Sequence, residues 1–429
     1  MTSSHHNSRP VLAVGLMSAP EVDITFISGF ALTGAHRYSI ADIREPLMIT
    51  PASADSVFEL GGVTIGIGFH WQQRQSQRFN GAVELVPHNG KIVVINHVDV
   101  EDYLRSVISS EMNASSPIEF LKAHAVISRS WVLRQIGRRT TAVAAPVADA
   151  DCEEIIRWYD REDHTLFDVC ADDHCQRYQG VTRLTTPVAD EAIKATTGLV
   201  LTHGGEICDA RFSKCCGGAT EVFDTCWADE HHPYLQSFRD TLPAAPHPDL
   251  ASEEGAAQWI LSRPDAFCNT SDQELLGMVL NNFDLATTDF YRWEVTATST
   301  ELADIIRSKS GLDFGDIVDL IPLQRGPSGR LCRLKIVGTK LTRIIGKELE
   351  IRRLLSTSHL YSSAFIVEKS EEMNQRAEKI TTFTLRGAGW GHGVGLCQIG
   401  AAAMSLKGYD FSQILEHYYP DTTITKAYE

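Results

Sequence analysis

The chain has 429 residues and a net charge of −16, from 39 basic and 55 acidic side chains. That charge excludes a nucleic-acid backbone as an expected partner, because phosphates repel an acidic surface. A hydrophobic fraction of 43% and a charged fraction of 22% are typical of a globular protein, here long enough for two or three domains.

No stretch of the sequence has the length of a membrane span. The apolar run at 11–17 is too short for the hydrophobic part of a secretory signal, and no basic segment frames it. We therefore expect no membrane span and no export signal within this sequence. Ten cysteines at uneven spacing are too sparse for a disulfide scaffold, which leaves their redox state open.

The first part of the chain is expected to be rich in β-structure. Residues 1–9 are polar and predicted to be a disordered tail. Short apolar runs with alternation then fill 10–98, separated by turn signals such as Asn89-Gly90. This pattern predicts a β-rich N-terminal domain.

A helix is predicted from Val100 to about Asn113, and Glu111 is its most informative residue. Leu104, Val107, Ile108 and Glu111 share one helix face, so a carboxylate continues an apolar stripe. A carboxyl group that loses solvation holds its proton more tightly and can serve as a general acid near neutral pH. The alternative is a Glu at the helix end that turns to solvent or pairs with an arginine.

A second helix is expected to begin at Ser116-Pro117, with Ser116 as its cap and Glu119 three residues later. It continues to about Gly137 and carries Arg129 in its second half. Because the link is short, the two helices are expected to pack as a hairpin that brings Glu111 near the second helix.

Residues 140–165 are expected to be irregular, and a metal-ligand pattern follows them. His164, Cys170, His174 and Cys175 form a plausible tetrahedral zinc set, since Zn²⁺ accepts imidazole and thiolate together. Adjacent ligands depart from common zinc spacing, so a local disulfide or free thiols remain open. Four protein ligands would leave no position for water, and such a site would be structural.

Short strands and turns are expected at 179–222, where Arg211–Gly218 reads RFSKCCGG. Ser213 could donate a hydrogen bond to a substrate, although a structural turn also explains the segment. A Cys215 nucleophile has little support, because no sequence cue places a histidine base beside it.

Residues 245–285 look helical and irregular, and 293–369 alternates around a helix at 299–310. The run GAGWGHGVGLCQ at 387–398 then has five glycines in nine residues, which favours a loop that projects Trp390 and His392. No phosphate-binding lysine follows. An aromatic ring beside His and Gln suits a carbohydrate groove; a structural glycine turn is the alternative. Helices are expected at 396–407 and 411–419.

These segments, in order, resemble the SpoIID/LytB family of peptidoglycan-acting proteins. The resemblance rests on VEDYLRSVISSEM, LKAHAVISRSWVL, RFSKCCGGATEVFDTCW with HPYLQS, and GAGWGHGVGLCQIGAAAMSLKGYDFSQILEHYYP. It covers roughly residues 90 to 425. Lys214-Cys215-Cys216 departs from the smaller polar residues that many members have before Gly-Gly.

The resemblance implies a lytic transglycosylase that cuts between N-acetylmuramic acid and N-acetylglucosamine. Glu111 would be the catalytic acid and then the base, so a second carboxylate is not required. It also implies structural zinc at the four ligands before Gln176. The predicted substrate contacts are Arg129, Ser213, Trp390, His392 and Gln398.

We therefore predict an α+β fold whose catalytic core is interrupted. The predicted parts are a tail at 1–9, a β-rich domain at 10–98, a first core part at 99–240 with a zinc segment at 164–176, a middle domain at 241–380 and a second core part at 381–429. The resemblance places the protein in the cell envelope with peptidoglycan as substrate. The alternatives are a non-catalytic enhancer of an N-acetylmuramoyl-L-alanine amidase and a zinc-stabilised binding protein of unrelated function.

Overall fold

The structure is a computed structural model. It describes residues 9–67, 72–113, 116–137, 153–159, 164–172, 174–183, 187–280, 289–373 and 379–429. The predicted tail at 1–9, except Arg9, and most of the predicted irregular stretch at 140–165 lie outside the described residues. The fold is α+β with a β-rich N-terminal region, as predicted.

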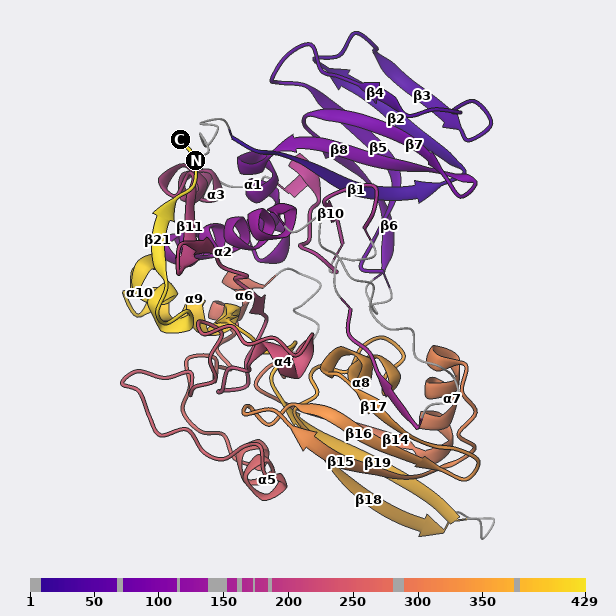
Figure 1. The fold of residues 1–429 in the computed structure, drawn as a ribbon, viewed down its shortest axis with the longest axis vertical. Helices are drawn as coiled ribbons and strands as arrows, with labels where there is room; N and C mark the ends of the chain where they lie inside the picture. Colours follow the sequence, from indigo (N-terminus) through magenta and orange to yellow (C-terminus); the bar gives the residue numbers. More distant parts are fainter. Residues whose placement is uncertain are drawn as a thin grey trace.

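Two packed sheets form the N-terminal region (Figure 1). The strands are β1 (Val11–Ala19), β2 (Glu21–Ser28), β3 (Gly34–Ser39), β4 (Leu47–Ile49), β5 (Val57–Ile65), β6 (Gln73–Phe79), β7 (Ala82–His88) and β8 (Lys91–Asp99). One sheet has the order β10-β1-β8-β7-β4, where β10 is Val169–Cys170, and the other has the order β3-β2-β5-β6. Strand β10 therefore joins the predicted zinc segment to the N-terminal sheet.

Two helices follow β8, as the sequence predicted. Helix α1 (Val100–Glu111) begins at the cap Asp99, whose carboxylate accepts from the Glu101 amide. Helix α2 spans Ile118–Gly137. The helix begins at Ile118, one residue later than predicted, and the hydroxyl of Ser116, the predicted cap, donates to the Met278 carbonyl.

A buried ion pair fixes the packing of α1 on α2. The Arg129 guanidinium donates to both carboxylate oxygens of Glu101, at 3.0 and 2.6 Å, and also to the Leu199 carbonyl. The same carboxylate accepts from the Gly198 amide at 3.2 Å and from the Tyr428 hydroxyl at 2.5 Å. Glu101 therefore joins both helices to two later parts of the chain.

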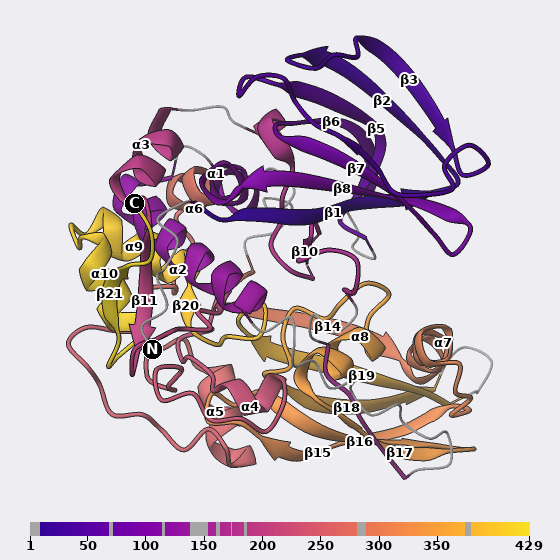
Figure 2. The same cartoon turned by 45° about the horizontal axis from the view of Figure 1, so that its top comes forward.

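The remaining core elements come from both halves of the sequence. They are a 3₁₀ helix (Gly180–Arg183), α3 (Pro187–Ala195), β11 (Leu199–His203), β12 (Glu206–Ile207), β13 (Phe212–Ser213), α4 (Phe223–Cys226), α6 (Gln273–Val279), β20 (Leu396–Cys397), α9 (Gln398–Leu406), α10 (Phe411–Tyr418) and β21 (Thr423–Lys426). Strand β11 pairs with β21, and β13 pairs in parallel with β20. Chain segments far apart in sequence thus complete one core (Figure 2).

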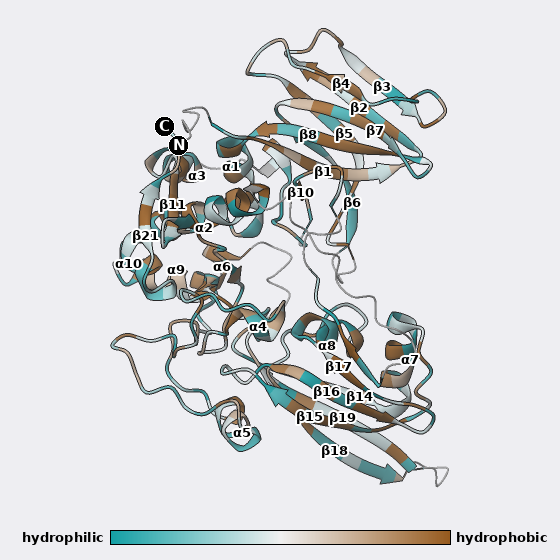
Figure 3. Ribbon diagram, viewed as in Figure 1, coloured by the Kyte–Doolittle hydropathy of each residue, from teal (hydrophilic) through white to brown (hydrophobic). Residues whose placement is uncertain are grey.

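A second hydrophobic core lies in the middle of the chain. It contains β14 (Arg292–Thr298), α7 (Ser299–Ser310), β15 (Ile317–Arg325), β16 (Leu331–Gly338), β17 (Thr342–Gly346), α8 (Glu348–Leu354), β18 (Phe365–Met373) and β19 (Lys379–Ala388), with β9 (Glu154–Ile156) added to β17 and α5 (Glu253–Leu261) on β18. The outer end of β18 is exposed and hydrophilic (Figure 3).

Two predicted domain boundaries and the placement of one strand differ from the structure. Strand β19 pairs with β14 and β18 up to Ala388, so the middle domain does not end at 380. Residues 267–280 pack on the core with α9, so the middle domain does not begin at 241. Strand β9 lies in the middle domain although its sequence precedes the zinc segment. Local sequence patterns predict helices and strands, but they do not predict which sheet a strand joins.

We predict that Arg129→Leu lowers the free energy of unfolding by about 3–5 kcal/mol, because it leaves the Glu101 carboxylate buried without a cation. Denaturant titration measures this. The control is Arg37→Leu, which removes an exposed ion pair with Asp23 and is expected to cost below about 1 kcal/mol. Equal costs for the two variants would contradict the role of the buried pair.

Candidate active site

Glu111 is the last residue of α1, and its carboxylate is only partly buried. The three apolar residues predicted to share its face, Leu104, Val107 and Ile108, have no exposed surface. The apolar stripe therefore faces the core, and Glu111 stands where this stripe reaches the surface.

Two other segments hold the end of α1. The Arg177 amide donates to Glu111 Oε1 at 2.8 Å, and the Arg177 guanidinium donates to the Ser110 carbonyl at 3.4 Å. Lys214 Nζ lies 3.4 Å from the Glu111 carbonyl oxygen. The ammonium group offsets the negative end of the helix dipole at this point. Arg177 and Lys214 were not among the predicted site residues.

The predicted zinc ligands come together directly before Arg177. The ligand atoms of His164, Cys170, His174 and Cys175 all lie within 4.8 Å of one another. Cys175 Sγ is 3.3 Å from His164 Nε2 and 3.6 Å from His174 Nδ1. A tetrahedral zinc ion separates sulfur and nitrogen ligands by roughly 3.5 Å, so the donor set fits the ion.

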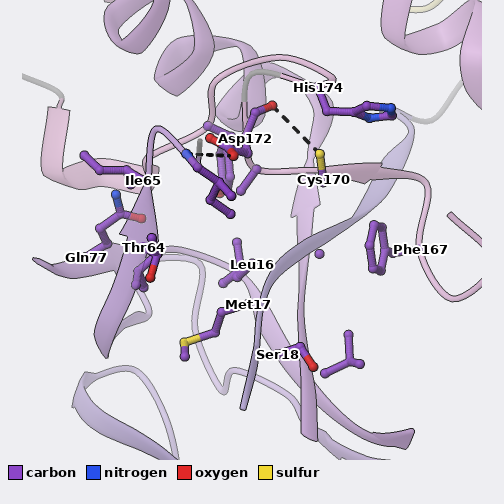
Figure 4. A pocket seen from close by; sticks show the side chains of 16 residues that line it. Leu16, Met17, Ser18, Thr64, Ile65, Gln77, Phe167, Cys170, Asp172 and His174 are labelled. Carbon is purple, nitrogen blue, oxygen red and sulfur yellow. Dashed lines mark hydrogen bonds between the residues drawn. The ribbon is translucent and has the colours of Figure 1, made fainter. Parts of the chain in front are cut away.

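This ligand cluster is anchored to the N-terminal sheet. Strand β10 places Cys170 beside Gly15 of β1, and the Asp168 carboxylate accepts from the Ala13 amide at 2.9 Å. Cys170 also lines a pocket of about 350 Å³ between β1, β5 and the loop at 167–174 (Figure 4). Glu111 does not line that pocket, which is mostly apolar and lies beside the cluster.

The segment 211–218 connects Glu111 with the glycine loop. Lys214 reaches the end of α1, while the adjacent Ser213 accepts a hydrogen bond from the Gly393 amide at 3.2 Å. Ser213 is nearly buried, so it holds the loop in place. The structure thus favours the structural role that the sequence left open for this serine.

Four glycines of the loop have positive φ angles that other residues rarely adopt. They are Gly389, Gly391, Gly393 and Gly395, with φ of 78, 93, 76 and 70°. A Cβ atom at Gly393 would lie 2.4 Å from Cζ of Arg330. The loop therefore requires glycine for its backbone shape and for its contact with Arg330.

Arg330 is a buried support of the loop that the sequence did not reveal. Its guanidinium donates to the carbonyls of Gly391 and Cys216 and to the Ser328 hydroxyl. Glu221 lies in the same network, and its carboxylate accepts from Ser328 at 2.6 Å. Burial raises the pKa of Glu221. Nothing in the local spacing marks these residues, because the contacts of Arg330 with Gly391 and Cys216 and of Glu221 with Ser328 each join residues more than 60 positions apart.

Trp390 and His392 of the loop are partly exposed. The Trp390 ring lies 4.4 Å from the Tyr361 ring and 4.9 Å from the Phe290 ring. His392 packs on Trp227. Burial lowers the pKa of His392 well below 6.5, and the positive charge of Arg211 lowers it further. His392 is thus neutral at physiological pH.

Two predicted substrate contacts are not accessible. Arg129 has no exposed surface, and its guanidinium is taken up by Glu101 and a backbone carbonyl. Gln398 is 2% exposed, and its amide nitrogen lies 3.0 Å from Nε2 of buried His124. Both predictions are wrong, because each polar group is part of the core. The pKa of His124 is lowered to about 3, mainly by burial and in addition by the positive charge of Lys214.

The site is thus a carboxylate at a helix end, framed by a potential metal cluster and an aromatic glycine loop. Residues 88–203, which include Glu111 and the cluster, match the family described as Stage II sporulation protein. Residues 221–395, which include most of the loop, match a domain of unknown function, DUF8618. The match over residues 88–203 supports an assignment of this part of the chain to the SpoIID family.

Three relatives show how far the similarity extends. The chain is 25% identical to an amidase enhancer of Bacillus subtilis over 75% of its own length and 40% of the relative's length. It is 23% identical to an uncharacterized protein of Brachyspira hyodysenteriae, over 85% and 77%. It is 24% identical to the stage II sporulation protein D of Bacillus amyloliquefaciens, over 78% and 76%. The chain thus spans less than half of the amidase enhancer.

We predict that Gly393→Ala distorts the glycine loop, since a Cβ there meets both a positive φ and the Arg330 guanidinium. The control is Gly408→Ala, which has φ of 90° but no atom within 4 Å of the new Cβ. The control should lower the free energy of unfolding by about 1–2 kcal/mol, which is the cost of the backbone conformation alone. Gly393→Ala should lower it clearly more, as measured by thermal or denaturant unfolding. Equal costs would mean that the contact with Arg330 is unimportant.

Proposed function

We propose that the protein is a peptidoglycan lytic transglycosylase with Glu111 as its catalytic residue. The observation that carries the proposal is the placement of Glu111, a partly exposed carboxylate at the end of a buried helix, within the residues that match the SpoIID family. The Arg177 amide fixes one carboxylate oxygen at 2.8 Å, which orients the group toward a bound strand.

One carboxyl group suffices for this reaction. Glu111 protonates the glycosidic oxygen as the bond to C1 of N-acetylmuramic acid breaks. The resulting carboxylate then accepts the proton of the 6-hydroxyl of the same sugar as that oxygen bonds to C1. The products are a 1,6-anhydro end and a free 4-hydroxyl, and no water is consumed.

The aromatic loop supplies the sugar-binding surface in this proposal. Trp390 and Tyr361 are both partly exposed and their rings lie side by side. His392 supports this loop from within, because its Nδ1 accepts from the Val394 amide and its ring packs on Trp227. Substrate and location follow from the same proposal: the glycan strands of the cell envelope.

We further propose structural zinc at His164, Cys170, His174 and Cys175. Four protein ligands close the coordination sphere, so the ion would stabilise the loop and take no part in the reaction. The last ligand, Cys175, lies two residues before Arg177. The ion would therefore hold the loop whose Arg177 amide orients Glu111.

We predict that Glu111→Gln reduces release of anhydromuramoyl products by a factor on the order of 10² to 10⁴, since the amide can neither give nor take the proton. Mass spectrometry of digests of intact and peptide-free glycan measures this. The control is Glu206→Gln, which changes an exposed carboxylate. Unchanged product release by Glu111→Gln would remove Glu111 from the mechanism.

A second function is favoured by the match to an amidase enhancer over 75% of the chain. In that case the protein binds peptidoglycan and stimulates an N-acetylmuramoyl-L-alanine amidase without cutting the glycan. Stimulation that survives Glu111→Gln, with no turnover by the unaltered protein, would establish this function in place of the first.

Cys175→Ser is predicted to remove one zinc ion per chain and to reduce product release, because the loop before Arg177 loses its anchor. Elemental analysis gives the zinc content. The control is Cys332→Ser, a buried thiol outside the cluster, which should keep the zinc. Equal zinc in both variants would contradict the assignment.

A further inference from the structure

Four potential ligands converge inside the core, away from Glu111 and from the first cluster. The ligand atoms of Cys216, Asp240, Cys268 and Cys397 all lie within 4.8 Å of one another, and all four residues are buried. We propose that these residues bind a second structural zinc ion. This inference does not depend on the proposed function.

The spacing of the sulfurs fits one ion. Cys216 Sγ lies 3.5 Å from Cys268 Sγ, and tetrahedral zinc with bonds of about 2.3 Å separates two sulfurs by roughly 3.8 Å. An iron–sulfur cluster would hold its cysteines further apart, because iron and sulfide atoms lie between them. Thiolates favour zinc over hard cations, and the carboxylate makes Cu(I) a poor choice.

The two carboxylate oxygens of Asp240 have different surroundings: one faces the sulfurs, and the other accepts hydrogen bonds. Oδ2 lies 3.4 Å from Cys216 Sγ, on the side of the sulfurs. Oδ1 accepts from the Tyr418 hydroxyl at 2.8 Å and lies 3.2 Å from His417 Nε2. This is the arrangement of a metal-binding carboxylate whose outer oxygen is oriented by hydrogen bonds.

The surroundings of Cys397 favour a thiolate, whereas burial raises the pKa of Cys216 and Cys268. Cys397 is the N-cap of α9, where the positive end of the helix dipole stabilises a negative sulfur. The Cys216 amide donates to Cys397 Sγ at 3.2 Å. Arg330 and Arg292 donate to the carbonyls of Cys216 and Gly217, so two guanidinium groups offset the negative charge of a site with three thiolates and a carboxylate.

The ligands come from four separate segments, and their positions suggest what the ion does. Cys216 and Cys397 flank residues 221–395, the segment that matches the second family, and lie next to the paired strands β13 and β20. Asp240 and Cys268 come from loops within that segment. All four ligands lie in or against the first core, so the ion would fasten the loops that carry Asp240 and Cys268 to Cys216 and Cys397, where the chain leaves this core and returns to it.

Metal content tests the proposal on the full-length protein, purified from zinc-containing medium without chelators. Two zinc ions per chain are expected, and one in Cys170→Ser/Cys175→Ser, which lacks the first site. X-ray absorption of that double variant should show three sulfurs and one oxygen around zinc. Cys268→Ser and Cys397→Ser should each lose one ion from the unaltered protein.

The matched control is Cys215→Ser, a buried thiol beside Cys268 and Cys397 that is not among the four ligands. It should keep two ions. Should the variants of the ligands not fold, the metal content and absorption spectrum of the unaltered protein still decide: two zinc ions with five sulfurs between them support the proposal. A single zinc ion that is lost in Cys170→Ser/Cys175→Ser, a different metal, or a Cys216–Cys268 disulfide found by mass spectrometry would overturn it. If the first site binds no zinc, Cys170→Ser/Cys175→Ser should have the same zinc content as the unaltered protein, which supports the second site.

Discussion

The carboxylate of Glu101 is the interaction on which the arrangement of the core depends. It has almost no exposed surface and accepts from Arg129 of α2, the Gly198 amide before β11 and the Tyr428 hydroxyl near the C-terminus. A buried carboxylate must be paired, so these partners are held in one geometry. Because Glu101 lies in the first turn of α1, it also determines where the other end of that helix, and hence Glu111, is placed.

Glu111 is positioned by parts of the chain that have no sequence pattern in common. The N-terminal sheet holds β10, the ligand cluster after β10 leads to Arg177, and the Arg177 amide binds the carboxylate. From the other side, Ser213 and Lys214 connect the glycine loop to the end of α1. The Glu111 carboxylate is thus oriented by the segments packed around it, although it lies at the surface.

Periodicity and composition were sufficient for the local structure. The helices at 100–111, 118–137, 299–310 and 411–418 could be predicted because apolar spacing and caps are local signals. The glycine loop could also be predicted from composition. Long-range partners could not: Arg129 and Gln398 looked available for substrate because a sequence does not show that Glu101 and His124 lie beside them. The second cysteine cluster was missed for the same reason, since its ligands are separated by 24 to 129 residues along the chain.

The pairing of β13 with β20 has a consequence for synthesis on the ribosome. Strands β1 to β8 and helices α1 and α2 are complete before residue 140, yet the last partners of the core, β20, α9 and α10, begin at Leu396. The middle domain, with its own hydrophobic core, emerges in between and can fold by itself. The nascent chain therefore carries the surface of α2 that later packs on α9 and α10 uncovered while more than half of the protein is made. In this interval that surface is exposed to aggregation and to chaperone binding.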